Sequence, residues 1–387
     1  MIKIRWKNTW IKYEKAEWSG TDTQCSRQLS FSVAWNPYDK SEKYNIALGD
    51  LIYLYDGNDN KFLGQVTSRE KKGTIGTAEY VAMDFMHHLL RSNGTFKFKN
   101  KTPEAITKSI CKSLGISTGK IATTKFNIDK VIYEDQCIYD IIVGVYKKAK
   151  AHTKKKYMPV MDGKKVCVIE KGKSSNVNLG QGYNVTDASY SDTLDNMVDK
   201  VVIYDEKRKK LGDVKNKSNI SKYGTYQQTY TKEKGKDAKK NAKALLVGIT
   251  KEATVTAVGD IRAISGKSIV LKDKATGLSG TFYITSDTHT FENGTHMMSL
   301  ELSWVNSMGE SAEEVKEKSN SSKKKLTNSS KAYYIEGSRV YHSSKACTAC
   351  KGKKLKSSTV KALKKIKLTR GSNKGKRKYR ACSKCWK

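Results

Sequence analysis

Four cysteines near the carboxyl end of the chain have the spacing of a metal site. Cys347 and Cys350 form one Cys-x2-Cys pair, and Cys382 and Cys385 form a second pair. One such pair presents two thiolates to a single ion, and two pairs complete the tetrahedron that zinc prefers. Because four protein ligands leave no position for water, the pattern predicts a structural zinc rather than a catalytic one.

A histidine nearby offers a second ligand set. The string YHSSKAC, which contains His342 and Cys347, resembles a small module in which the His and the following Cys bind zinc together with a later Cys-x2-Cys pair. This resemblance implies the ligands His342, Cys347, Cys382 and Cys385 and leaves Cys350 spare. Both sets remain open at this point, as do two disulfides or free thiols. The metal candidates are therefore four of the five residues His342, Cys347, Cys350, Cys382 and Cys385.

The region around these cysteines is strongly basic. Residues 321–387 contain 18 Lys and 4 Arg against one acid, so they carry +21 of the chain's formal net charge of +36. A basic patch with Tyr and Trp side chains suits nucleic acid, because neutralising phosphates supplies most nonspecific affinity. An acidic protein partner, anionic cell-wall polymers and a merely solvated tail are the alternatives.

Other chemically interesting residues have simpler explanations. His289 and His296 are expected to share a strand-pair face and could bind a metal together, but packed, hydrogen-bonded histidines suit their apolar surroundings better. Cys111 and Cys167 lie in apolar helix and strand patterns and are interpreted as buried packing residues. The sequence has no G-x-S-x-G, no H-E-x-x-H and no Gly-rich phosphate loop. We therefore predict no catalytic site.

No secretion or membrane signal is visible in the sequence. No apolar run approaches the roughly 18 residues that a membrane-spanning helix needs. The first residues, MIKIRWKNTW, enter a strand pattern directly, without the apolar region of a signal peptide. We expect assembly in the bacterial cytoplasm with reduced cysteines and no membrane span.

The elements that must position these residues are mostly strands. Leu29, Phe31, Val33 and Trp35 alternate with polar residues, as in a half-buried strand. A helix is predicted from a Thr102 cap with Pro103 at its first position, and a second amphipathic helix follows near residues 138–145. Hairpins are predicted at Asp162-Gly163 and Asn293-Gly294, and a Lys- and Ala-rich helix at residues 234–247.

Together these patterns predict an α+β, mainly β chain with a modular organisation. The predicted parts are a small antiparallel β-barrel or sandwich at 1–95, an α/β insertion at 96–175, a second β-rich part at 176–306, a linker at 307–331 and a small zinc-stapled module at 332–387.

Several blocks of the body resemble a known family, the XkdQ/YqbQ-type tail proteins of the defective Bacillus prophage PBSX, of clostridial phages and of R-type bacteriocins. These blocks are AEYVAMDFMHHLLRSNGTFKFKNKTPEAITKSICKSLGI (78–116), TLDNMVDKVVIYDE (193–206), SKYGTYQQTY (221–230), and GDIRAISGKSIVLKD with GLSGTFYITSDTHTFENGTHMMSLELSW (within 259–304). They occur in the family's order over about 300 residues, although no single block is diagnostic.

The resemblance implies a structural hub in the baseplate of a contractile phage tail or a phage-tail-like bacteriocin. The resemblance also implies that residues 1–95 and 176–306 are two tube-like antiparallel β-barrel domains. Three chains would then form a pseudo-sixfold ring of six such domains that joins the tail tube to the central spike. Its expected partners are further copies of itself, the tail tube or tube-initiator protein, the spike, the tape measure and other baseplate proteins of the virion. A zinc-dependent nucleic-acid-binding protein is the main rival, and a tail-associated cell-wall hydrolase is the weakest.

Overall fold

The computed structural model divides the chain into two compact units, Met1–Glu314 and Val315–Lys387, which are described separately. It describes residues 1–23, 26–39, 44–233, 237–308, 327–335, 339–343, 354–367, 375–376 and 378–382. Strands dominate both units, as predicted. None of the described helices is both long enough and apolar enough to cross a membrane.

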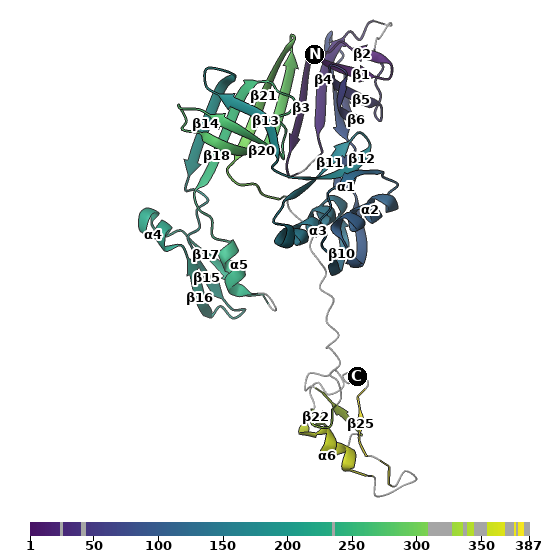
Figure 1. The fold of residues 1–387 in the computed structure, drawn as a ribbon, viewed down its shortest axis with the longest axis vertical. Coiled ribbons are helices and arrows are strands. Elements are labelled where there is room, and N and C mark those ends of the chain that lie inside the picture. The colour runs from purple at the N-terminus through teal and green to yellow at the C-terminus, as the bar shows by residue number, and fades with distance from the viewer. Residues whose placement is uncertain are drawn as a thin grey trace. The chain divides into compact units, whose positions relative to one another are not determined.

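The first half of the main sheet contains seven strands. They are β1 (Ile2–Trp6), β2 (Thr9–Ile11), β3 (Lys15–Thr21), β4 (Gln28–Trp35), β5 (Leu51–Asp56), β6 (Asp59–Glu70) and β7 (Gly76–Asp84). They pair antiparallel in the order β3-β4-β7-β6-β5-β1-β2 (Figure 1). The alternation predicted for β4 is confirmed, because Leu29, Phe31 and Val33 are buried in one core cluster.

The second half of the sheet contains β13 (Ser174–Gly180), β14 (Val185–Thr193), β18 (Thr250–Val258), β19 (Ser268–Lys272), β20 (Ser279–Glu292) and β21 (Thr295–Ser303). Their order is β14-β18-β21-β20-β19-β13. The predicted hairpin at Asn293-Gly294 is confirmed, since both residues have positive φ and Phe291 pairs with His296 across the turn. Met298, Leu300 and Leu302 of the return strand are buried in a second core cluster.

The two halves repeat one strand order. Across the sheet, five strands of the first half lie in the order β3-β4-β7-β6-β5, and five strands of the second half lie in the order β14-β18-β21-β20-β19. In both halves the strands that come first, second, fifth, fourth and third along the chain are therefore neighbours in that order. In both halves the fourth strand is long and carries a register shift, between Val66 and Ser68 in β6 and between Ile284 and Ser286 in β20. Each chain therefore contains two copies of the same antiparallel module.

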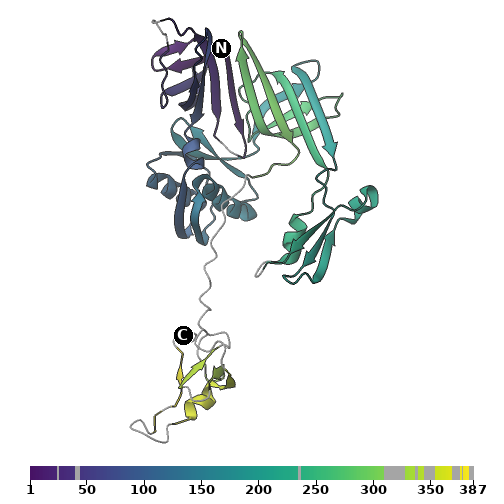
Figure 2. The same cartoon turned by 180° about the vertical axis from the view of Figure 1, so that it is seen from behind.

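These modules do not form the two closed barrels that the sequence predicts. Instead, β20 pairs with β3, so one sheet runs through both halves (Figures 1 and 2). Among the described strands, the hydrogen-bonded ladder does not close in either half. The halves share a continuous sheet because the last part of β20 extends beyond β19 and offers its edge to β3.

The insertion between the halves has its own apolar core. It contains α1 (Met86–Leu90), β8 (Asn93–Lys101), α2 (Pro103–Ser113), β9 (Thr118–Ile121), β10 (Ile128–Cys137), α3 (Ile138–Thr153), β11 (Tyr157–Asp162) and β12 (Lys165–Glu170). The predicted cap is confirmed, since the Ala105 amide donates to the Thr102 hydroxyl oxygen at 3.3 Å and Pro103 opens the helix. The predicted hairpin at Asp162-Gly163 joins β11 to β12.

A smaller sheet interrupts the second half. It consists of β15 (Lys200–Tyr204), β16 (Lys210–Lys215) and β17 (Gln227–Thr231), in the order β16-β15-β17, with α4 (Lys217–Tyr223) and α5 (Ala238–Ala244). Val201, Ile203 and Ala242 belong to its small separate core. The Lys- and Ala-rich helix was predicted, but this sheet was not.

The carboxyl-terminal unit contains β22 (Lys331–Tyr334), β23 (Val340–His342), β24 (Lys356–Thr359), α6 (Val360–Lys365) and β25 (Arg380–Ala381). Its strands form a four-stranded sheet in the order β24-β22-β23-β25. The hydroxyl oxygen of Thr359 accepts from the Ala362 amide at 3.3 Å and caps α6.

Candidate functional site

The pairing of β3 with β20 brings a group of buried polar side chains together between the two halves. On the inward face, Ala16, Trp18 and Gly20 of β3 lie opposite residues 291, 289 and 287 of β20. Gly20 leaves room for Arg27, because a Cβ at this position would lie 2.6 Å from the Arg27 Nη1 atom and would displace that side chain. The junction is therefore built around the side chain that fills this space.

That side chain forms a buried ion pair across the junction. Arg27, which precedes β4, directs both terminal guanidinium nitrogens at Asp287 of β20, with a distance of 3.0 Å from Nη1 to Oδ1. The Asp287 side chain is fully buried and the Arg27 side chain is 15% exposed. The Ser265 amide also donates to Asp287 at 2.6 Å, and the guanidinium lies 3.8 Å from the Trp18 ring.

The charge of Asp287 is stabilised in this setting. Burial disfavours its carboxylate, but the charge and hydrogen bonds of Arg27 outweigh that effect, so the pKa of Asp287 lies below its ordinary value. A bidentate Arg–carboxylate pair fixes both partners in orientation. The two halves are thus joined by a charge pair as well as by backbone hydrogen bonds.

Two histidines continue this network as packed, hydrogen-bonded residues. His289 Nε2 lies 3.1 Å from the Ala263 carbonyl oxygen, and His289 Nδ1 lies 3.0 Å from His296 Nε2. Because the carbonyl only accepts, His289 Nε2 carries the hydrogen and Nδ1 accepts from His296. Burial lowers the pKa of His289 to about 4, so both rings fit a neutral pair.

A second buried carboxyl holds the segment that carries Arg27. Asp84, at the end of β7, accepts from the Ser26 hydroxyl at 2.9 Å, the Arg27 amide at 3.0 Å and the Met86 amide at 3.0 Å. Burial raises the pKa of Asp84 to about 6. This carboxyl links the Arg27 segment to the start of α1 in the insertion.

Another buried ion pair attaches the insertion to the sheet. Lys171 follows β12 and lies 2.5 Å from a carboxylate oxygen of Asp22, directly after β3, and both side chains are nearly inaccessible. The same ammonium donates to the Ser307 carbonyl oxygen. The insertion is thereby held to the segment after β3 in the first half and to the segment after β21 in the second half.

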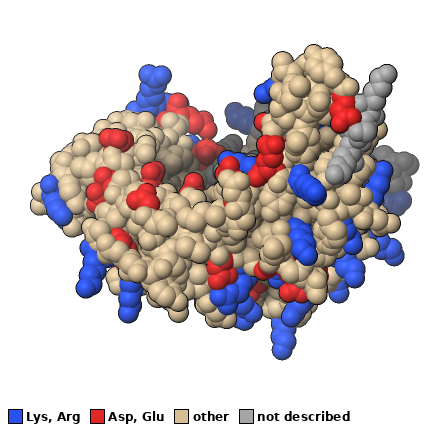
Figure 3. All heavy atoms as spheres, turned by 90° about the horizontal axis from the view of Figure 1, so that it is seen from above, with Lys and Arg blue, Asp and Glu red and all other residues tan. Residues whose placement is uncertain are grey.

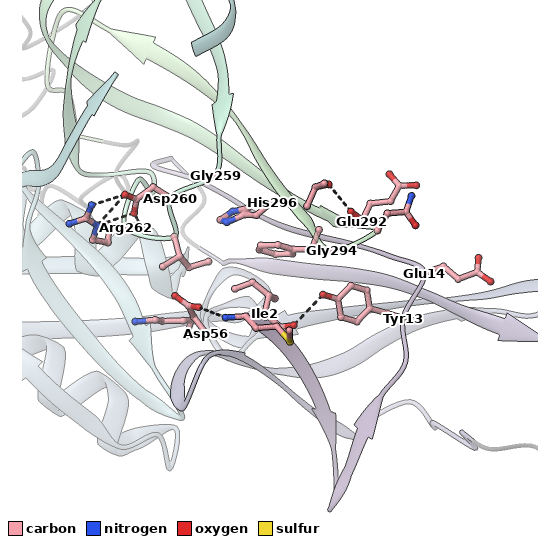
Figure 4. Close-up of a pocket in the computed structure, with 16 residues that line it drawn as sticks. Ile2, Tyr13, Glu14, Asp56, Gly259, Asp260, Arg262, Glu292, Gly294 and His296 are labelled. Carbon is pink, nitrogen blue, oxygen red and sulfur yellow. Dashed lines mark hydrogen bonds and ion pairs between the residues drawn. The ribbon is translucent and has the colours of Figure 1, made fainter. Parts of the chain in front are cut away.

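A hollow of about 1170 Å³ opens beside this junction and is lined by residues of both halves. Figure 3 shows Asp and Glu side chains around the hollowed face, with Lys and Arg mainly at its periphery. The polar groups in Figure 4 interact with their neighbours: Arg262 contacts Asp260 at 2.6 Å, the amino terminus lies 3.4 Å from Asp56, and Tyr13 donates to the Ile2 carbonyl at 3.3 Å. The described lining residues thus form no nucleophile–base set.

The cysteines interpreted as packing residues lie where predicted. Cys111 in α2 and Cys167 in β12 are both buried. Burial raises the pKa of the Cys111 thiol to about 11 and also raises that of Cys167, so the reactive thiolate is disfavoured at both.

Only part of the predicted metal site can be located. His342 ends β23 and Cys382 follows β25, and both are buried. Cys347, Cys350 and Cys385 lie outside the described residues. Within the residues that the structure does describe, no group of three or more His, Cys, Asp and Glu side chains has the geometry to hold a metal ion.

Replacing one partner of the Arg27–Asp287 pair is expected to destabilise the first unit strongly. Asp287→Leu leaves a buried guanidinium without its counter-charge and should lower the free energy of unfolding by about 3–5 kcal/mol. Adding Arg27→Met should recover most of this loss. The measurement is urea unfolding followed by tryptophan fluorescence.

A matched control for that prediction is Glu170→Gln, which breaks the exposed Lys155–Glu170 pair and should change stability much less. If Asp287→Leu lowered the free energy of unfolding as little as Glu170→Gln does, the buried ion pair would not be what holds the two halves together.

The raised pKa of Asp84 predicts a pH-dependent difference between the wild type and Asp84→Asn. The carboxyl binds its proton more tightly when folded, so its stabilising contribution is complete below its ordinary pKa of 3.8 and is lost as the pH rises through about 6. On acidification from neutral pH, the wild type should gain up to roughly 3 kcal/mol relative to the variant.

The measurement for Asp84 is the difference in unfolding free energy between the two proteins across this pH range. The buried histidines, present in both proteins, cancel from the difference. A difference that stays constant with pH would show that Asp84 titrates normally.

Comparisons with known proteins identify relatives for most of the chain. The Bacillus subtilis (strain 168) phage-like element PBSX protein XkdQ is 25% identical over 308 residues, covering 77% of this chain and 94% of that protein. The uncharacterized protein YqbQ of the same strain is 26% identical over 276 residues, covering 68% and 84%. These relatives confirm the resemblance expected from the sequence blocks.

Two solved structures share the fold. The 43 kDa tail protein of prophage MuSo2 from Shewanella oneidensis has a TM-score of 0.62 at 14% identity, with 78% of this chain and 97% of that chain covered. The tail protein from Neisseria meningitidis MC58 has a TM-score of 0.58 at 12% identity, with 78% and 95% covered. At these identities the likeness concerns the fold alone.

A family model described as YQBQ-like matches residues 16–303, which comprise the first half of the main sheet except β1, β2 and the first residue of β3, the insertion, and the second half. Because this match covers well over half of the sequence, the chain belongs to the YQBQ-like family.

Proposed function

We propose that this protein is a structural hub of the baseplate in a contractile phage tail or a phage-tail-like bacteriocin, where three copies join the tail tube to the central spike. Its family membership and its fold, shared with phage tail proteins, support a role in a tail. The observation that carries the hub role is the repeated strand order, because it leaves two complementary sheet edges uncovered in each chain.

The junction inside the chain serves as a template for contacts between chains. Its two partners are the fourth strand of the second half, β20, and the first strand of the first half, β3. In the repeated order, the fourth strand of the first half is β6, which corresponds to β20. The first strand of the second half is β14, which corresponds to β3. Repetition of the same contact between copies would pair β6 of one chain with β14 of the next.

Both of these strands have a free edge. Within the described part of the chain, β14 pairs along its length with β18 alone, and residues 67–70 of β6 pair with β7 alone. Unpaired strand edges invite pairing with another chain. Arg69 near one edge and Asp192 on the other carry opposite charges and are both exposed, which favours this match.

A contact between different edges of identical chains is head-to-tail and must close into a ring or continue as a filament. Closure would pair the free edge of β6 and the edge of β14 in every copy. Three copies, as the family resemblance implies, would arrange six equivalent modules around one axis. Such a ring has the symmetry to connect a sixfold tube with a threefold spike.

The ring predicts a specific cross-link. Ser68→Cys should form disulfides between chains when combined with Ser191→Cys, Asp192→Cys or Thr193→Cys, because directly opposite residues in a strand pair have Cβ atoms about 5 Å apart. Mild oxidation followed by denaturing electrophoresis should give a covalent ladder that ends at the trimer. Light scattering of the wild type with tube and spike proteins should show the same stoichiometry.

Two controls accompany the cross-link. Each single-cysteine variant measures the background from native cysteines, and Ser68→Cys with Lys217→Cys places the second thiol on α4, away from the edge of β14. A protein that stays monomeric with its partners present, and that gives no ladder above background, would contradict the ring.

The basic carboxyl-terminal region favours nucleic acid binding as a second candidate function. In that case the full chain should bind duplex DNA at low salt, and the affinity should fall steeply as salt is added, because released counterions drive such binding. A chain truncated after residue 320 retains the first compact unit and should lose the binding. Fluorescence anisotropy with labelled DNA measures the affinity of the full chain and of the truncated chain. Equal affinities would exclude the basic carboxyl-terminal region as the DNA-binding element.

A further inference from the structure

We propose that Arg69 of one chain forms an ion pair with Asp192 of a neighbouring copy, in the strand register that Asp287 and Gly20 have inside the chain. This pairing rests on the proposed hub role and would form the contact between copies in its ring. A residue-by-residue correspondence between the two halves of the main sheet supports it.

The two long strands β6 and β20 correspond closely. Val66 in β6 and Ile284 in β20 directly precede the register shift of each strand. The Val66 carbonyl oxygen accepts a hydrogen bond of 2.9 Å from the amide of Gly49, whose φ is positive. The Ile284 carbonyl oxygen accepts the equivalent bond of 3.0 Å from Gly266, whose φ is also positive. The loop beside β20 leaves its edge open to β3, so the equivalent loop beside β6 leaves room for a strand as well.

The first strands of the two halves can be aligned from this correspondence. Arg69 and Asp287 occupy the same position, three residues after Val66 and Ile284. Strand pairing through β7 and β4 connects Arg69 to Ala16 of β3. Strand pairing through β21 and β18 connects Asp287 to Ala188 of β14. The alignment of β3 with β14 is thereby fixed.

The aligned positions carry complementary charges. Inside the chain, Gly20 of β3 lies opposite Asp287 of β20. Asp192 of β14 corresponds to Gly20, so the same register sets Asp192 of one copy opposite Arg69 of the next. Both side chains are exposed within a single chain. Opposite charges that face each other across an antiparallel strand pair stabilise it, and they favour this register over its neighbours.

Neighbouring side chains are placed to support the ion pair. Tyr190 donates its hydroxyl to a carboxylate oxygen of Asp192 at 3.0 Å. Lys251 of β18 lies opposite Asp192 within the chain, so the carboxylate would lie between two cations. Arg69 donates one N–H group to the Ile46 carbonyl oxygen at 3.1 Å, and a guanidinium has further N–H donors for a carboxylate.

The exposure of one aromatic side chain indicates the same occupant. Trp18 of β3 is 3% exposed, because the second half of the sheet lies beside it. Tyr190 holds the corresponding position in β14 and is 36% exposed. A copy that pairs its β6 with β14 would cover Tyr190 as β20 covers Trp18. The partner that fits this edge is therefore a second copy of the chain.

Disulfide formation in the full chain tests the register. Ser68 and Thr193 correspond to Ser286 and Thr21, which lie directly opposite each other. Ser68→Cys should therefore cross-link roughly tenfold faster with Thr193→Cys than with Ser191→Cys, whose diagonal separation exceeds the reach of a disulfide. Faster cross-linking with Ser191→Cys would indicate a register shifted by two residues and would overturn the pairing.

Charge reversal tests the ion pair itself. Arg69→Glu and Asp192→Arg should each weaken self-association of the full chain roughly tenfold, because like charges would then face each other. Both substitutions in one chain should restore the association, because every contact again joins opposite charges. Sedimentation at rising protein concentration, alone and with tube and spike proteins, measures the dissociation constant.

The matched control is Lys108→Glu with Asp129→Lys, which reverses two exposed charges in the insertion and should leave self-association unchanged. Urea unfolding of each variant checks that the fold is intact. Copies that assemble equally well with and without the reversals would reject this ion pair while leaving the hub role standing. A chain that stays monomeric with tube and spike proteins present would contradict both.

Discussion

Seven consecutive residue pairs between β3 and β20, together with the Arg27–Asp287 ion pair beneath them, unite two otherwise separate modules. Each module has its own apolar core, and Phe291 of β20 is buried in the core of the first half, so the two modules also share apolar contacts. The backbone ladder supplies hydrogen bonds, and the ion pair supplies orientation, since its bidentate geometry tolerates little rotation. The relative position of the modules, and hence the curvature of the combined sheet, depends on this junction.

The surrounding polar groups are arranged to keep that junction fixed. Asp84 positions the backbone that precedes Arg27, and the Ser265 amide orients Asp287 from the opposite side. The insertion is attached at the same place through Lys171 and Asp22. In the proposed ring each chain would contribute one β3–β20 junction. A rigid junction would then matter more than a large buried area, because a deviation in the angle between the modules would be repeated in every copy.

Local features of the fold could be predicted from the sequence, because their causes are local. The Thr102 cap, the Asp162-Gly163 turn and the alternation in β4 each depend on a few neighbouring residues. The junction could not be predicted in this way, since Arg27 and Asp287 are 260 residues apart and neither has a distinctive motif. The extra sheet of β15 to β17 was missed because its strands are short and lack a period-2 burial pattern, since β15 buries the successive residues Val201, Val202 and Ile203. The candidate metal ligands could be named from the sequence because Cys-x2-Cys is a spacing typical of zinc sites, and the metal itself stays a prediction.

The small sheet between β14 and β18 has a structural consequence for how this family can vary. Its entry and exit are adjacent, since Val198 and Val247 exchange backbone hydrogen bonds of 2.9 Å, and the flanking strands already pair from Thr193 to Thr250. Its core is also separate from that of the main sheet. The small sheet is therefore an insertion between the two strands of the β14–β18 hairpin. Such an insertion can be lengthened, exchanged or lost while the main sheet keeps its register, because both of its ends meet at one point of the β14–β18 pair.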